Sequence, residues 1–388
     1  MTYAVGSSEM RTSGASIYRG QVEPGPLSLG IVIHDFALGG TERIAIRLAR
    51  AWCELGAAVT IFCGSTEGPL LALLDPRVRI ARAPTPIARE RGSRRKLARK
   101  AAAYFAREPV DGVFVPGNFH WSIIPSLARL PEAVRPVIVA HVSAALDKPQ
   151  RGWLRQKAFN LRMRYMLRRA TSIVTLSNFA RDKANAIAGG KRALTIPLPA
   201  LEDDIAAPLP LPNRKTIVAA GRLVPEKGFR DLIDAFAALS DPVARLVIVG
   251  AGPAEQALRA RVRWHRMDDR VRFPGYAQDI RSWLDVARIV VLPSHFEGYP
   301  AVLVEALAAG RPIVATSCTP ATTELLGDAA FGRTVPIRDV AALTEAIRDL
   351  LAAPPPDPAA LARSVSRHRM KPVAIAYLDL FANLIAAR

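Results

Sequence analysis

The sequence predicts an α/β protein with two doubly wound, parallel-sheet, Rossmann-like domains that face each other across a cleft. Short β-branched apolar runs alternate with helical periods in the first half of the chain, and the same alternation restarts after a Pro-rich segment at 197–214. Proline removes a backbone donor and stiffens the chain, so this segment reads as a linker. Ligands of such sheets bind beyond the carboxyl ends of the strands, so we expect the functional site in the cleft.

The expected domains follow from this pattern. A polar, Gly/Ser-rich, disordered tail at 1–28 precedes an N-terminal domain at 29–198 and a C-terminal domain at 199–371. A final helix at 372–388 is expected to pack back on the first domain. The strands expected are 30–34, 58–62, 112–115, 136–140 and 172–176 in the first domain, and 216–220, 246–249, 289–292 and 312–316 in the second.

The composition is typical of a globular protein without a membrane-spanning segment. Half of the 388 residues are apolar, which is enough for proper cores, and no apolar run reaches the roughly 18–20 residues that span a bilayer. The first 28 residues contain no apolar run of the kind found in signal peptides. The three cysteines form no Cys-x-x-Cys pair, so a reducing, cytoplasmic compartment is expected.

The net charge of +19 is concentrated in two basic runs of the first half. Residues 89–100 carry seven basic residues and one Glu, and residues 148–169 carry eight basic residues and no acid. Such a surface attracts nucleic acid, anionic lipid or phosphorylated ligands. The alternative is that each run is the solvated face of an ordinary helix.

The segment 294–316, SHFEGYPAVLVEALAAGRPIVAT, carries the most chemical information. Glu305 would lie in the second turn of a helix that starts near Pro300, and Glu297 would lie in the loop before it. The two carboxylates could then contact opposite ends of one ligand. The unpaired N–H groups at the start of the helix could donate hydrogen bonds to phosphate oxygens. Alternatively, Glu297 is a helix cap and Glu305 an exposed ion-pair partner.

Two further loops follow strands. In GRLVPEKG, at 221–228, Arg222 and Lys227 could place two cations on a diphosphate, although a plain surface loop explains the pattern too. Gly39 and Gly40 precede a helix after the first strand and could bring backbone close to a ligand, or simply form a tight turn.

Together, EGYPAVLVEALAAGRPIVAT, GRLVPEKG and GGTER resemble glycosyltransferase family 4 (glycosyl transferases group 1), which has the GT-B fold. The resemblance covers roughly residues 29–352 and includes the family's E-x7-E spacing at Glu297 and Glu305. It implies that Arg222 and Lys227 hold the donor diphosphate, that Glu305 binds the nucleotide ribose, and that Glu297 contacts the donor sugar. The backbone N–H groups of Gly298, Tyr299 and Ala301 match the cradle of sugar and phosphate. Glu324 matches an acid frequent in the family, without an assigned role here.

The resemblance also points to the first domain. His141 is similar to the histidine that family members place beside the reacting sugar. By position alone, His34-Asp35 after the first strand and Asn118-Phe119-His120 after the strand at 112–115 are acceptor-side candidates. Many members have Gly where this chain has Pro300, so one N–H of the cradle is missing.

The resemblance implies a retaining hexosyltransferase without an essential metal or other cofactor. Separately, no Asp-x-Asp motif suited to Mg²⁺ occurs in the matched loops. On family frequency, a UDP-sugar is favoured and a GDP-sugar is possible, with a lipid-linked or saccharide acceptor in surface polysaccharide or glycolipid assembly. The second domain would bind the donor and the first the acceptor.

Residues 153–169, taken as a helix, carry two apolar stripes separated by basic rows. One stripe consists of Leu154, Ala158, Leu161 and Tyr165, and the other of Phe159, Met163, Met166 and Leu167. One stripe could pack on the core while the other dips into an anionic lipid interface, which would make the protein peripheral on the inner face of the cell membrane. Alternatively, both stripes are buried.

Three other functions are alternatives to glycosyl transfer, and the sequence argues against the first two. A basic protein that binds nucleic acid should show a recognisable motif, and none occurs, so no specific nucleic-acid partner is expected. A dinucleotide oxidoreductase would need a third glycine after Gly250 and Gly252, but residue 255 is Glu. A GT-B nucleotide-sugar epimerase or hydrolase would turn over the donor without an acceptor.

Overall fold

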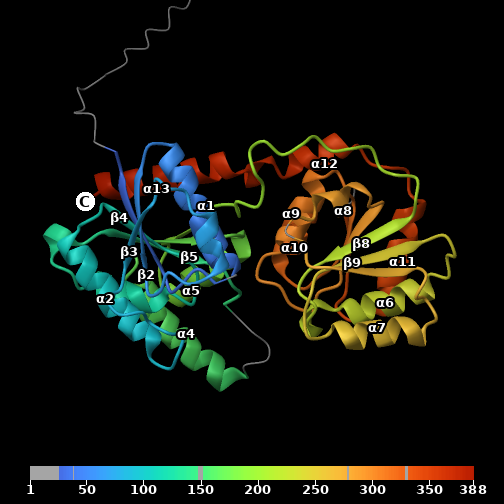
Figure 1. Cartoon of the computed structure of the whole chain (residues 1–388), viewed down its shortest axis with the longest axis horizontal. Helices are drawn as coiled ribbons and strands as arrows, with labels where there is room; N and C mark the ends of the chain where they lie inside the picture. Colours follow the sequence, from blue (N-terminus) through green and yellow to red (C-terminus); the bar gives the residue numbers. More distant parts are fainter. Residues whose placement is uncertain (1–25, 38, 147–151, 278, 328–330) are drawn as a thin grey trace, which may run out of the picture.

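The computed structural model describes residues 26–388 except 38, 147–151, 278 and 328–330. It has two lobes, each built on one parallel sheet with helices on both faces (Figure 1). Both the α/β prediction and the GT-B expectation of two doubly wound sheets are thereby confirmed. The disordered tail expected at 1–28 falls largely outside the described residues.

The N-terminal sheet has seven strands in the order β3-β2-β1-β4-β5-β6-β7. Its strand order reverses between β1 and β4, which is the point where doubly wound sheets bind ligands. The strands are β1 Ser28–Ile33, β2 Ala58–Cys63, β3 Arg79–Arg82, β4 Gly112–Val115, β5 Val137–Val142, β6 Ser172–Thr175 and β7 Ala193–Thr195. The helices are α1 Gly40–Glu54, α2 Ser93–Arg107, α3 Ile124–Leu127, α4 Trp153–Leu167, α5 Asn178–Ala188 and the C-terminal α13 Met370–Ala386.

The C-terminal sheet has six strands in the order β10-β9-β8-β11-β12-β13, with its reversal between β8 and β11. The strands are β8 Thr216–Ala220, β9 Arg245–Val249, β10 Val271–Gly275, β11 Ile289–Leu292, β12 Ile313–Thr316 and β13 Gly332–Val335. The helices are α6 Phe229–Ala238, α7 Glu255–Trp264, α8 Arg281–Asp285, α9 Ala301–Ala308, α10 Pro320–Leu326, α11 Val340–Ala352 and α12 Pro358–Ser364. Short 3-10 turns include η5 Pro225–Lys227 and η6 Ser366–His368.

The edge strands β3, β7, β10 and β13 are absent from the sequence-based prediction. They are short and partly polar, because an edge strand buries less of its surface than a central one. The central strands read as continuous apolar runs, since helices cover both faces of a parallel sheet.

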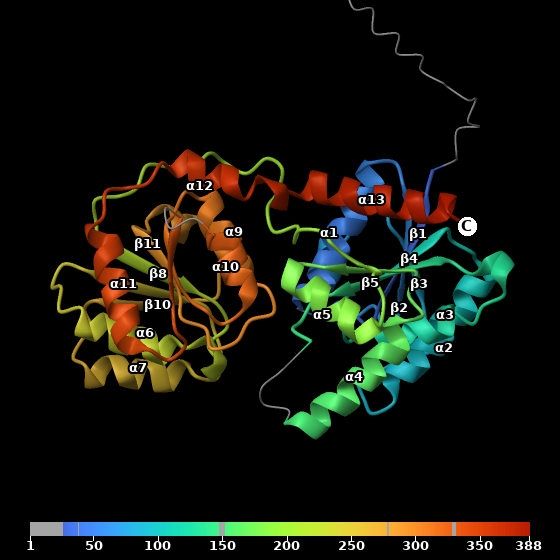
Figure 2. The same ribbon diagram turned by 180° about the vertical axis from the view of Figure 1, so that it is seen from behind.

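Helix α13 leaves the C-terminal lobe and packs on the N-terminal one (Figures 1 and 2). The indole N–H of Trp52 in α1 donates to the carbonyl of Ala374 in α13 at 3.2 Å. The Trp52 ring also meets Tyr377 and Phe381 edge to face, with centroid distances of 5.9 and 6.1 Å. Helix α13 is thus part of the N-terminal core.

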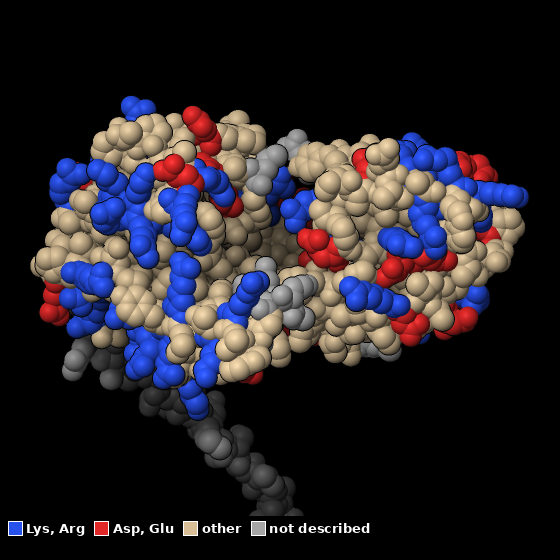
Figure 3. Space-filling view, turned by 90° about the horizontal axis from the view of Figure 1, so that it is seen from below, with Lys and Arg blue, Asp and Glu red and all other residues tan. Residues whose placement is uncertain are grey.

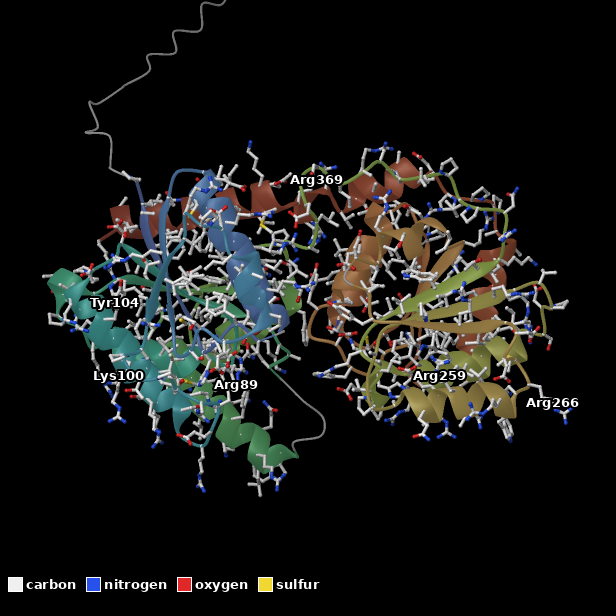
Figure 4. The ribbon with its side chains drawn as sticks, viewed as in Figure 1. Arg89, Lys100, Tyr104, Arg259, Arg266 and Arg369 are labelled. Atoms are coloured by element: carbon white, nitrogen blue, oxygen red, sulfur yellow. The ribbon has the colours of Figure 1, made fainter. Side chains whose placement is uncertain are left out.

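The chain crosses between the lobes twice, and the two crossings pair with each other. The N–H of Leu201 donates to the carbonyl of His368 at 3.1 Å, and the N–H of Met370 donates to that of Leu201 at 2.9 Å. Arg369, labelled between the lobes in Figure 4, donates to the carbonyl of Asp203 at 2.8 Å. This double crossing, called the hinge below, connects the two lobes. No helix among the described residues has the length and apolarity needed to cross a membrane.

Candidate active site

A cavity of about 250 Å³ lies between the lobes. Ser143 to Leu146 after β5 and Phe179 and Lys183 of α5 line it from the N-terminal lobe, and residues 295–298 and 318–320 line it from the other. The space-filling view shows this hollow between the lobes (Figure 3). The carboxyl ends of both sheets face it, as expected for ligand sites in doubly wound folds.

Lys227 and Glu297 meet beside this cavity. The Lys227 ammonium forms an ion pair with Oε1 of Glu297, and the hydroxyl of Ser294 donates to the same oxygen at 3.0 Å. Both charged side chains are mostly shielded, with 22% and 11% of their surface exposed. A cation and a carboxylate from two different loops are therefore held in one shielded position.

The two loops are joined by specific contacts. The His295 N–H donates to the Glu226 carbonyl at 2.8 Å, and its ring lies 2.7 Å from the Asp231 carboxylate. Gly228 has a φ of 65°, and a Cβ there would come within 2.0 Å of the Pro293 carbonyl oxygen. Only glycine allows this approach, so the GRLVPEKG sequence is what lets Lys227 reach Glu297.

Arg222 lies farther out. It is exposed, its guanidinium lies 3.7 Å from the Glu226 carboxylate, and it lines a second cavity of about 370 Å³ at the ends of β8, β9 and β10. Gly250 and Tyr276 line this cavity too. The structure therefore does not bring Arg222 into contact with the Lys227–Glu297 pair; its exposed guanidinium lies beside Glu226 at the same edge of the sheet.

Helix α9 begins at Ala301, one residue after Pro300. The Ala301 N–H donates to the Tyr299 carbonyl at 3.0 Å, so it is already used and does not form the free donor that the sequence suggested. Within the described residues, the N–H groups of Gly298 and Tyr299 have no acceptor. The cradle is thus reduced to these two donors.

Glu305 occupies the second turn of α9 and faces α1 of the other lobe. Burial raises the pKa of Glu305 to about 7, against the opposing charges of Arg47 and Arg43. Arg43 and Arg47 line a neighbouring interdomain cavity of about 340 Å³ with Asp279. The exposed ion-pair role considered for Glu305 is not observed: among the described residues its carboxylate has no cation within ion-pair distance, and the nearby Arg47 pairs with Glu202 instead.

His141 lies inside β5 rather than after it, because β5 runs two residues beyond the predicted end. The ring is 1% exposed and lies 5.7 Å from Phe114, and neither nitrogen has a hydrogen-bond partner among the described residues. Burial lowers its pKa to about 4, so the ring is neutral at physiological pH. A buried imidazole without a partner costs about 1–3 kcal/mol.

His34 follows β1 directly and is fully buried. Its Nδ1 lies 3.3 Å from Asp35, whose carboxylate accepts two hydrogen bonds from Arg89 at 2.5 and 2.7 Å. Burial lowers the pKa of His34. The backbone N–H of His34 donates to Nε2 of His120 at 3.2 Å, and Nδ1 of His120 lies 2.7 Å from the Pro116 carbonyl.

Asn118 and the pair Gly39 and Gly40 have structural roles that the sequence did not predict. The Asn118 amide donates to the Ala144 carbonyl and accepts from the Ser143 N–H, both at 3.2 Å, so it holds the loop that lines the cavity. The Glu42 carboxylate, bound by Arg89 at 3.2 Å, folds over Gly39, where a Cβ would lie 2.2 Å from it. Gly40 remains open, with no atom within 4 Å of a Cβ position.

The Asp35–Arg89–Glu42 network and the contacts of Phe119 with arginines were not predicted. Arg89 and Arg94 each lie 5.2 Å from the centroid of the Phe119 ring, which is 37% exposed. Arg89 belongs to the basic run at 89–100, and only the fold shows that it pairs with acids near the end of β1. No group of three His, Cys, Asp or Glu side chains suited to a metal ion occurs in the described part of the chain.

Comparison with known proteins agrees with this geometry. Residues 38–197 match the model of Glycosyltransferase Family 4, and residues 214–353 match that of Glycosyl transferases group 1. The chain therefore belongs to the family 4 glycosyltransferases with the GT-B fold.

Individual relatives differ in their named activities. The glycogen synthase of Mycobacterium tuberculosis is 32% identical over 53% of this chain and 51% of its own length. The 2-deoxystreptamine N-acetyl-D-glucosaminyltransferase of Streptomyces fradiae is 28% identical over 89% of this chain and 87% of its own. The chain spans about half or less of the first curated relatives it matches. The Anabaena HepE structure with UDP and glucose has a TM-score of 0.73 at 18% identity, over 92% of this chain and all of its own.

Proposed function

We propose that this protein transfers a hexosyl unit from a nucleoside diphosphate sugar to an acceptor hydroxyl, with retention of anomeric configuration and without an essential metal. The observation that carries the proposal is the shielded contact of Lys227 with Glu297 beside the interdomain cavity. A cation there can meet a phosphate, and a carboxylate there can accept hydrogen bonds from sugar hydroxyls.

In the proposed step, the bond between the anomeric carbon and the diphosphate oxygen breaks, and the diphosphate leaves with the electron pair. The acceptor hydroxyl attacks on the same face, and its proton passes to the departing phosphate. Lys227, Arg222 and the N–H groups of Gly298 and Tyr299 would stabilise the growing negative charge, with Arg222 reaching the diphosphate from the neighbouring cavity at the same sheet edge. Domain closure about the hinge would exclude water, which competes as an acceptor.

His141 has a supporting part in this proposal. Its neutral ring has one donor and one acceptor nitrogen, neither with a partner among the described residues, and a sugar hydroxyl at the end of β5 would satisfy one of them. Glu305 is assigned to the ribose hydroxyls, because a half-buried carboxylate on α9 can accept two hydrogen bonds from a diol. A UDP-sugar is the favoured donor, supported by the HepE complex, and a GDP-sugar is the second choice.

The proposed acceptor is a lipid-linked saccharide of surface polysaccharide or glycolipid synthesis, reached from the cytoplasmic face of the membrane. Support comes from the basic runs at 89–100 and 148–169 and from α4. In α4, Met163, Met166 and Leu167 of one apolar stripe are buried, whereas Leu154, Leu161 and Tyr165 of the other stripe are exposed. The alternative in which both stripes are buried is therefore wrong.

A thermal-shift panel of UDP, GDP, ADP and their sugars tests donor binding. Ligand at 100 times its Kd stabilises the folded state by about 2.7 kcal/mol, so the correct nucleotide should raise the melting temperature clearly above the others. Lys227→Ala should abolish the shift, and Lys215→Ala, which removes an exposed lysine paired with Asp241 at 2.7 Å, should not. No shift with any nucleotide contradicts the proposal. Donor turnover at full rate without acceptor would instead support an epimerase or hydrolase.

A further inference from the structure

A second large hollow lies on the N-terminal lobe, away from the interdomain cavity. It measures about 970 Å³ and is formed by α2, α3 and α4. We call it the arginine groove, because six of its lining side chains are arginines: Arg91, Arg94, Arg95, Arg99, Arg129 and Arg162. The described residues that line it include no Asp or Glu. Figure 3 shows Lys and Arg side chains gathered on this face of the lobe, where α2 and α4 lie in Figure 1.

The charges of the groove are not neutralised within the protein. Among the described residues, none of the six guanidinium groups forms an ion pair with a carboxylate, although Arg89, at the end of the same run, pairs with Asp35 and Glu42. Arg129 donates only to the hydroxyl of Tyr165, at 2.9 Å. Like charges so close together repel, and an anion that enters the groove relieves that repulsion. Planar guanidinium groups favour phosphate oxygens in particular.

An exposed apolar surface continues from the groove wall. Tyr165 and Met166 of α4 line the groove, and Tyr165 belongs to the exposed stripe of that helix. Leu154 and Leu161 of the stripe are 66% and 62% exposed, and Trp153 at the start of α4 is 70% exposed. Exposed Leu and Trp side chains beside a basic groove suit an acyl interface beneath charged headgroups.

We propose that the arginine groove binds the phosphate-bearing headgroup of an anionic membrane lipid while the exposed stripe of α4 enters the lipid interface. The groove is then a discrete phosphate site and not only part of a general positive field. This inference rests on the membrane-side acceptor of the proposed function, but it is independent of the donor chemistry.

The test is a flotation assay of the full chain with vesicles of phosphatidylglycerol and phosphatidylcholine, and with phosphatidylcholine alone. The groove variant is Arg95→Gln with Arg162→Gln. The matched control is Lys100→Gln with Arg107→Gln, two exposed cations of α2 that do not line the groove. Figure 4 labels Lys100 on α2. Both variants lower the net charge by the same amount. If only the overall positive charge mattered, the two variants should therefore lose vesicle binding equally.

We expect wild type to bind only the anionic vesicles, the groove variant to bind at least tenfold more weakly, and the control to stay within about twofold of wild type. Equal losses in the two variants, or no binding of wild type at low salt, would overturn the proposal. So would loss of DNA-duplex binding in the groove variant with vesicle binding unchanged. The nucleotide-induced thermal shift is measured on the same variants. It should be unchanged, so failure of the lipid site and failure of the transferase proposal give different results.

Discussion

The carboxylate of Glu324 in α10 accepts a hydrogen bond of 3.1 Å from the backbone N–H of Asn178, the first residue of α5. The next N–H, of Phe179, donates to the second carboxylate oxygen at 3.1 Å. The two helices belong to different lobes. The first N–H groups of a helix lack partners within it, and the helix dipole is positive there, so an acid is favoured at this point. Glu324 thus joins the lobes beside the cavity that Phe179 lines.

Glu324→Ala should shift the protein toward a more open arrangement. An acid at an exposed helix start contributes up to about 1 kcal/mol, which corresponds to about a fivefold change in the ratio of closed to open molecules. Small-angle X-ray scattering should report a larger radius of gyration. Glu345→Ala, which removes an exposed acid paired with Arg348 on α11, serves as the control. Identical scattering from the two variants would show that Glu324 does not hold the lobes.

Lys227→Ala should lower kcat/KM for transfer by two to three orders of magnitude, because it removes the shielded cation nearest the cavity, an effect of about 3–4 kcal/mol. Glu297→Ala should be comparably severe. Because the two side chains touch, the double variant should lose less than the sum of the single losses. Steady-state kinetics of the four proteins measure this coupling. Additive losses would mean that the two residues act separately.

The central strands were predictable because a parallel sheet covered on both faces demands continuous apolar runs. Likewise, Gly228 signalled a turn, and its close approach to Pro293 is the physical reason why GRLVPEKG meets the Glu297 loop. Edge strands such as β3 carry no such signal, because Arg79 and Arg82 leave only half of the strand apolar.

The contacts made by Glu324 and by Arg89 were not predictable from the sequence. Glu324 and Asn178 are 146 positions apart, and no local pattern relates them. The same holds for Arg89 and Asp35, which the sequence separates into a basic run and a strand end. For α4, the helical period identified two apolar stripes, but only the packing of Met163 and Met166 on the core shows which stripe remains exposed.

Phe381→Ala should destabilise the N-terminal lobe by about 3–5 kcal/mol, the usual cost of removing a buried Phe side chain. Phe381 is fully buried, and its ring lies where a Cβ on Gly112 would clash with it at 2.4 Å. Denaturant titration monitored by tryptophan fluorescence should reveal the loss. Ile375→Ala on the same helix, at a side chain that is 39% exposed, should cost far less. Equal effects would mean that α13 adds stability along its whole length and not through its buried face.

The raised pKa of Glu305 predicts a pH dependence of opposite sign for stability and for donor binding. Burial raises the pKa from 4.5 to about 7 in the folded protein. Between these two values the folded state holds a proton that the unfolded state has lost. The free energy of unfolding therefore falls as the pH rises from about 4.5 to about 7, by at most about 1.4 kcal/mol per pH unit from this group.

Donor binding should instead strengthen as the pH rises through about 7, because only the ionised Glu305 accepts hydrogen bonds from both ribose hydroxyls. The measurement is the Kd of UDP-glucose between pH 5.5 and 8.5. Its diphosphate diester does not titrate in this range, so a change in affinity reports on the protein. Glu305→Gln should bind more weakly at pH 8 and should lose the pH dependence, since the amide does not ionise. A wild-type profile that is flat, or one that persists in Glu305→Gln, would show that another group titrates or that Glu305 does not bind the ribose.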